Sequence, residues 1–334
     1  WVDRLLGWID RLPIPAWVLY PVVLVLTVLI INAARWVEGN ARFGALDAPF
    51  AFVAFYPIAN LAAIHYLDRT ARRAFDSFRL ALGRSDEEAE RFKYQLTVLP
   101  ARGALLAAAA GLGLMVLVVV GAIGSQEAVA LGLGPYFWSL VICAFAGMAI
   151  TAELLYHTVR QLGIVSRIHE AATNVDLYHF SPLYSFSALT ARTGLVFGLN
   201  LWFDLAINPE TMSSPPLIAL NAALLVLGAA CFLLPLEGMH RRIVVEKRRL
   251  EGDVNQRIQV LVGRLYERVD GNELGDADAM NKMMNSLIAT RELIGKVPAW
   301  PWRPETFTVF FSALTLPVVV FVIQMALKAS LGFK

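Results

Sequence analysis

Residues 103–122, GALLAAAAGLGLMVLVVVGA, decide the fold class, because twenty consecutive residues carry no charge. A helix of this length is about 30 Å long, which matches the hydrocarbon thickness of a bilayer. The run lies inside a charge-free gap that extends from Arg102 to Glu127. It therefore predicts a helix that crosses a membrane.

Five other gaps between charged residues are long enough for the same purpose. They are Arg11 to Arg35, Asp47 to Asp68, Glu127 to Glu153, Glu210 to Glu237 and Glu305 to Lys328. A seventh segment, about 185–208, is apolar but carries Asn200 and Asp204, so an interfacial or re-entrant segment is its alternative.

The composition agrees with a membrane protein. Apolar residues make up 57% of the chain, charged residues only 17%, and the mean hydropathy is +0.57. Soluble domains have about 45–50% apolar and about 25% charged residues. We therefore predict an all-α, polytopic membrane protein with about seven transmembrane helices and a cytoplasmic helical bundle.

The distribution of basic residues predicts the orientation. With seven spans, one side of the membrane receives 25 of the 29 Lys and Arg residues. Because loops rich in Lys and Arg stay in the cytoplasm, the amino terminus and the three large loops are predicted to be cytoplasmic. We expect the protein in the cytoplasmic (inner) membrane.

These boundaries divide the chain into six segments. They are an interfacial amphipathic helix (1–12), the first two spans (13–66), a cytoplasmic helical hairpin (67–100), spans three to six with a cytoplasmic loop at about 159–186 (101–236), a second cytoplasmic hairpin (237–303) and the seventh span (304–331).

Both cytoplasmic hairpins have sequence signals of their own. Ser85 followed by Glu88 forms a capping box, which predicts that a helix begins there. In the second hairpin, apolar residues recur at helical spacing; they are Val254, Ile258, Leu261, Leu265 and Val269, then Met280, Met283, Leu287 and Ile294. A stripe rich in Met is more often core than a groove for a partner. We therefore expect the two hairpins to cover each other's stripes.

A basic run follows the sixth predicted span. It contains Arg241, Arg242, Lys247, Arg248 and Arg249. Contact with anionic lipid headgroups explains such a run better than nucleic-acid binding does.

Polar side chains in and beside the spans form two predicted layers. Ionisable groups are costly in a bilayer and are functional candidates by default. The outer candidates are Asn200, Asp204 and Asn221, and the inner candidates are Glu153, His157, Glu237 and His240.

The inner candidates also allow a metal hypothesis. Glu153 precedes His157 by four residues and Glu237 precedes His240 by three, so each pair shares a helical face. Together with His65 they could bind a divalent metal such as Zn or Fe. Contact with headgroups, water and nearby Arg residues is the simpler alternative.

No nucleotide-binding, hydrolase or kinase motif is present; this leaves enzymatic activity open and favours a protein that is not an enzyme. The first functional hypothesis is a channel- or transporter-like protein with a cytoplasmic gating or assembly bundle, either a homo-oligomer or a subunit of a membrane complex. The second is a non-transporting scaffold or sensor that binds a protein partner through its cytoplasmic helices. The third is a metal- or haem-binding redox component.

Overall fold

A computed structural model of the protein describes most of the chain. The described residues are 1–46, 48–122, 134–173, 177, 180–207, 215–271, 275, 277–302, 305–308, 310–312, 315, 316, 319 and 323.

These residues form helices and no strand, which confirms the prediction of an all-α protein. The helices are α1 (Val2–Ile9), α2 (Ala16–Val37), α3 (Ala48–Leu82), α4 (Asp86–Thr97), α5 (Ala101–Ala122), α7 (Pro135–Ala171), α8 (Phe180–Leu183), α9 (Ser185–Ile207), α10 (Pro215–Asp270) and α11 (Ala277–Gly295).

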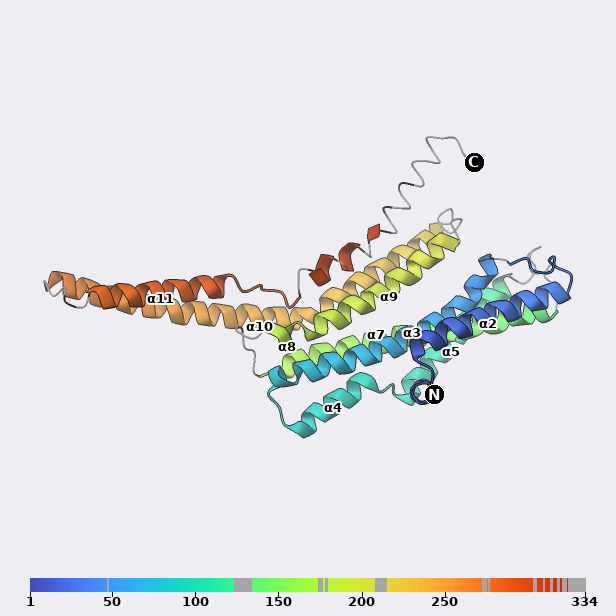
Figure 1. Ribbon diagram of the computed structural model, residues 1–334, viewed down its shortest axis with the longest axis horizontal. Helices are drawn as coiled ribbons and strands as arrows, with labels where there is room; N and C mark the ends of the chain where they lie inside the picture. The colour runs from blue at the N-terminus through green and yellow to red at the C-terminus, as the bar shows by residue number, and fades with distance from the viewer. Residues whose placement is uncertain are drawn as a thin grey trace.

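The helices are arranged in two packed groups and one projection (Figure 1). In the first group α3 and α5 lie against α7, α2 lies against α3, and α4 lies beside α3 and α7. In the second group α9 packs on α10, and both contact the first group. The far half of α10 projects beyond both groups and carries α11 along its side (Figure 1).

Three segments are long and apolar enough to cross a membrane: Ala16–Val37, Asp86–Val120 and Pro135–Ala171. Their large apolar side chains face outward, since Ile30 is 64% exposed and Leu117 is 69% exposed. Water would disfavour such a surface, whereas lipid tails cover it at no cost.

The amino-terminal helix α1 packs into the protein core. Val2, Leu6 and Ile9 are buried in the same cluster as side chains of α3 and α7. Trp8, which directly precedes Ile9, is 57% exposed. The helix therefore packs beside the middle of the α3–α7 pair, where Trp1 contacts Glu153 and Asp10 contacts His65 and Arg69, and it leaves Trp8 exposed.

The capping box is confirmed. The Ser85 hydroxyl accepts a hydrogen bond from the Glu88 amide and so begins α4. Gly83 precedes it with φ of +61°, a left-handed conformation that favours glycine over other residues. The chain can therefore turn sharply between α3 and α4.

The two predicted hairpins do not cover each other. In the described residues, α4 lies on the α3 and α7 side, whereas α11 lies only along α10 (Figure 1). Met283 is accordingly 57% exposed and Val260 is 51% exposed. The expected mutual burial of the apolar stripes is thus not found, because the 56 residues of α10 carry its hairpin away from α4.

The basic run of α10 mainly joins helices. Arg242 donates to the carbonyls of Glu170 and Ala172 at the end of α7, and Lys247 donates to the carbonyls of Gly295 and Val297 after α11. A cation suits both places, since a helix C-terminus presents unpaired carbonyls and a partial negative charge.

The other basic residues of the run differ in their surroundings. Arg241 pairs with Glu237, and Arg249 pairs with Glu246, whereas Arg248 is exposed without a partner in the described part of the chain. Headgroup contact by this run stays a prediction, and the structure gives four of its five residues a role within the chain.

Candidate functional site

The site lies in the seam between α3 and α7, which run parallel. Asn60 Nδ2 donates to Thr151 Oγ1 at 2.8 Å, and 22 residues further along α3 the Leu82 carbonyl accepts from the Thr173 amide at 3.2 Å. Both contacts join residues 91 positions apart, so the two helices keep one register along the seam.

Close approach of the helices depends on Gly147. A Cβ atom added there would lie 3.3 Å from atoms of both Tyr56 and Pro57. The glycine thus lets the backbones of α3 and α7 approach each other, as small residues do between helices in membranes.

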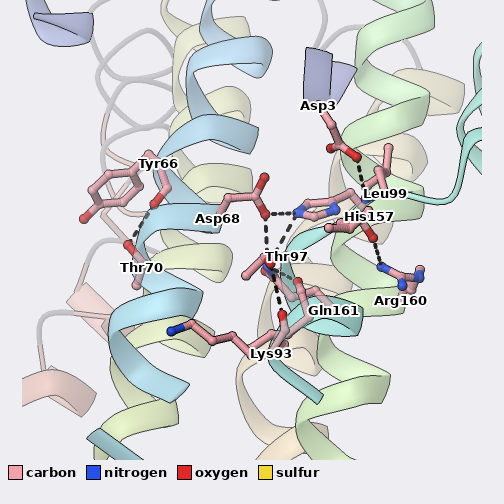
Figure 2. Close-up of polar contacts among 12 residues, drawn as sticks. Asp3, Tyr66, Asp68, Thr70, Lys93, Thr97, Leu99, His157, Arg160 and Gln161 are labelled. Carbon is pink, nitrogen blue, oxygen red and sulfur yellow. Dashed lines mark hydrogen bonds and ion pairs between the residues drawn. The ribbon is translucent and has the colours of Figure 1, made fainter. Parts of the chain in front are cut away.

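At the centre of the seam, a carboxylate meets an imidazole. His157 Nε2 lies 2.9 Å from Asp68 Oδ1, and the two side chains are 0% and 6% exposed. Gln161 Nε2 lies between Asp68 Oδ1, His157 Nε2 and the Leu96 carbonyl, at 3.5, 3.5 and 3.3 Å (Figure 2). The glutamine amide is therefore placed to donate to the Asp68 carboxylate or to the Leu96 carbonyl.

The short contact also assigns a tautomer. When Asp68 is ionised, its carboxylate only accepts, so a neutral His157 carries its proton on Nε2. Nδ1 is then an acceptor. It has no hydrogen-bond partner within the described residues.

Helix α1 and the segment after α4 close one side of this cluster. Asp3 Oδ2 accepts from the Leu99 amide at 3.0 Å, and Arg160 donates to the Val98 carbonyl at 2.8 Å (Figure 2). Burial raises the pKa of the Asp3 carboxyl above its usual value, although the hydrogen bond from Leu99 opposes this change. A second acid therefore stands beside Asp68 and His157.

Glu153 lies one helical turn before His157. It is 0% exposed, and its Oε1 accepts from the Trp1 indole at 2.7 Å. Glu153, His157 and Gln161 recur every four residues, so all three occupy one face of α7.

Several polar atoms of the seam are buried without a partner. In the described residues these are Asn60 Oδ1, Glu153 Oε2, His157 Nδ1, Thr158 Oγ1 and Gln161 Oε1. An unsatisfied buried polar atom costs about 1–3 kcal/mol, and such atoms in protein interiors usually bind ordered water. These five atoms are therefore candidate positions for ordered water.

A second polar group lies one turn earlier on α3. His65 Nδ1 is 3.0 Å from the Tyr20 hydroxyl, and its Nε2 is 3.0 Å from Asp10 Oδ1. Arg69 also bonds to Asp10. Burial would raise the pKa of Asp10, but the hydrogen bond from Arg69 and the nearby His65 outweigh it, and the pKa lies below its usual value.

Of the predicted inner candidates, only Glu153 and His157 come together in the seam. Glu237 is half exposed and pairs with Arg241. His240 Nδ1 bonds to the Ala299 carbonyl at 2.9 Å, and its ring stacks on Trp300 with centroids 4.0 Å apart.

The outer candidates are described only in part. Asn200 donates to the Val196 carbonyl of its own helix at 2.9 Å. The side chains of Asp204 and Asn221 lie outside the described residues.

The metal hypothesis gains no support. Among the described residues no three His, Cys, Asp or Glu side chains lie together as a metal site. His65 faces Asp10, His157 faces Asp68 and His240 faces Trp300, so the three imidazoles lie in separate surroundings.

Sequence reasoning missed Asp68 and Gln161. Asp68 served only to mark the end of an apolar gap, and Gln161 carries no charge. One signal was available: Gln161 continues the four-residue spacing of Glu153 and His157 along one face of the helix. A polar stripe of about two turns beside a predicted span indicates a polar partner on another helix.

Comparison with known proteins does not identify a relative: no family model, curated protein or solved structure matches the chain.

Proposed function

We propose that the protein is a channel- or transporter-like membrane protein that transfers protons, with the α3–α7 seam as its cytoplasmic vestibule. The observation that carries this proposal is the buried Asp68–His157 pair together with five partnerless polar atoms along the same seam. Ionisable groups buried in a membrane protein are costly, and they commonly mark proton relays.

The composition of the site favours a proton over a metal ion. One carboxylate and one imidazole at hydrogen-bond distance can share a single exchangeable proton. A hard cation such as Ca²⁺ needs about six to eight oxygen ligands, which a carboxylate, an imidazole and one amide cannot supply.

The depth of the Asp68–His157 pair in the proposed membrane supports a role in a cytoplasmic vestibule. His157 follows Pro135 by 22 residues, or about 33 Å of helix, so it would lie at the inner boundary if the hydrocarbon begins near Pro135. In this proposal the chain spans the membrane seven times, its amino terminus and basic loops are cytoplasmic, and Asn200, Asp204 and Asn221 line the outer side. Assembly as a homo-oligomer or within a larger complex is part of the same proposal.

Proton flux into liposomes tests the proposal. The purified chain is reconstituted with a trapped pH-sensitive dye, and a potassium gradient with valinomycin drives proton entry. We expect Asp68→Asn and His157→Gln to lower the flux at least tenfold, because each removes one half of the exchangeable pair. Asp76→Asn is the matched control, since Asp76 lies on the same helix but forms an exposed pair with Lys93. Wild-type flux equal to that of empty liposomes, or full flux in both variants, would refute the proposal.

A second function, a non-transporting sensor or scaffold, is favoured by a different observation. Helix α10 continues without interruption from an uncharged segment, 215–236, into the charged half that carries α11. Such a helix could connect the membrane part to a partner. A stoichiometric protein partner retained during purification, with no proton flux, would support this alternative over the first.

A further inference from the structure

The hairpin of α10 and α11 contains an open groove of about 830 Å³. Its apolar lining consists of Val260, Leu261, Met283 and Leu287, two from each helix. Since Val260 and Met283 are more than half exposed, the groove presents apolar surface to its surroundings. A monomer gains nothing from this exposure, which is typical of a recognition surface.

The charges around the groove are not balanced. Arg257, Arg264 and Lys282 line it together with a single carboxylate, Asp253. Lys282 pairs with Asp278 at 2.8 Å, and Asp253 lies 3.7 Å from Arg249.

Two cations remain. Arg257 and Arg264 have no acidic partner in the part of the hairpin that the structure describes. They stand seven residues apart, or about 10 Å along one face of α10, with Val260 and Leu261 between them.

The position and charge of Arg257 and Arg264 argue against two occupants of the groove, a second copy of the chain and a lipid surface. A second copy of the groove would bring the same two guanidinium groups face to face, and like charges oppose that pairing. A lipid surface is too distant: Arg257 lies 20 residues, or about 30 Å, beyond Glu237, where the uncharged part of α10 ends. Attraction to a charged surface is screened within about 8 Å at physiological salt.

We propose that this groove binds an acidic amphipathic helix of a partner protein. The helix would place apolar side chains on the floor formed by Val260, Leu261, Met283 and Leu287, and carboxylates spaced two turns apart against Arg257 and Arg264. Apolar anchors on one helical face, laid into a groove between helices, are a common mode of recognition. The inference is independent of proton transfer and would deepen the scaffold or sensor alternative.

Charge reversal on both sides of the interface tests it. The probe is a fluorescent 21-residue helical peptide with Leu on one face and Glu repeated every seven residues beside it. A second peptide carries Lys in place of Glu. Binding to the full chain in nanodiscs of neutral lipid is followed by anisotropy. We expect the Glu peptide to bind wild type at least tenfold more tightly than the Lys peptide, and we expect R257E/R264E to reverse this order.

Two further variants make the result specific. Arg291→Glu changes an exposed charge of α11 outside the groove and should leave the order of the two peptides unchanged. Val260→Asp places a charge on the exposed apolar floor and should weaken the Glu peptide at least fivefold. Unchanged circular dichroism shows that each variant is folded.

Three outcomes would overturn the proposal. The first is equal binding of both peptides to wild type, or no reversal in R257E/R264E. The second is binding of phosphatidylserine vesicles that R257E/R264E abolishes, which would assign the groove to lipid. The third is concentration-dependent dimerisation of wild type that Val260→Asp abolishes, which would assign it to a second copy.

Discussion

The α3–α7 seam and the α10–α11 hairpin differ in which side chains they bury and which they expose. The seam buries Glu153 and His157 completely, whereas the hairpin leaves Met283 57% exposed. Burying charges costs desolvation energy, and exposing apolar surface forgoes hydrophobic stabilisation. Each region thus departs from what stability alone favours, in opposite directions, and such departures are expected at functional sites.

The largest expected effect comes from breaking the buried pair of the seam. His157→Ala leaves the buried Asp68 carboxylate with only the longer contact to Gln161, so we expect a loss of about 3–5 kcal/mol in unfolding free energy. Unfolding by SDS titration in mixed micelles measures it. The double variant Asp68→Leu/His157→Leu should recover part of the loss, because no unpaired charge remains. A change below about 1 kcal/mol in His157→Ala would show that the pair is not desolvated.

Arg242 joins α10 to the end of α7, so its replacement tests the contact between these two helices. Arg242→Ala takes away two hydrogen bonds to the last carbonyls of α7, and we expect a loss of about 1.5–3 kcal/mol in thermal unfolding experiments. Arg241→Ala is the control, since its exposed pair with Glu237 should contribute about 0–1 kcal/mol. Equal effects of both variants would mean that Arg242 contributes no more than a surface charge.

Glycine replacements in the α5–α7 contact and in the α10–α11 hairpin should change the unfolding free energy in opposite directions. A Cβ at Gly111 would lie 2.6 Å from the Met148 carbonyl oxygen, so Gly111→Ala should destabilise the packing of α5 on α7 by about 1–3 kcal/mol. Gly263 of the hairpin has nothing within 4 Å, and Gly263→Ala should stabilise α10 by about 0.5–1 kcal/mol. Thermal unfolding of both variants checks the signs, and two changes of the same sign would contradict the described packing.

The smallest expected effect is the change with pH in the unfolding free energy that Asp10, at the end of α1, contributes. The pKa of Asp10 is lower in the folded protein than in the unfolded one. Its contribution to the free energy of unfolding is therefore present at pH values above the unfolded pKa of 3.8. It is lost as pH falls through the lowered folded pKa. With Asp10 partly exposed, we expect less than about 1 kcal/mol. Stability curves of wild type and Asp10→Asn should converge as pH falls from 5 to 2; a constant difference would exclude this role.

Local features of the fold could be predicted from the sequence. The start of α4 at Ser85 and the helical class follow from residues close together in the chain. The central feature of the site could not be predicted this way, because Asp68 and His157 are 89 positions apart. Their meeting depends on the register of α3 against α7, which Gly147 and the packing of the seam determine together.

The contacts of the basic run of α10 could not be predicted from the sequence for a different reason. Charge distribution indicates which side of a membrane a loop prefers, and this is a statement about the surroundings of the chain. It cannot indicate that Arg242 and Lys247 bond to the ends of α7 and α11, since those carbonyls become available only after the helices pack. The same residues can serve topology and packing.

The unbroken length of α10 has a mechanical consequence. Pro235 cannot donate a backbone hydrogen bond, so it marks the natural pivot of this rod, and His169 of α7 bonds directly to its carbonyl. The 35 residues beyond it form an arm of about 53 Å, along which a tilt of about 10° at the pivot would swing the tip by about 9 Å. A slight rearrangement of α7 would thereby be amplified at the far end of the molecule.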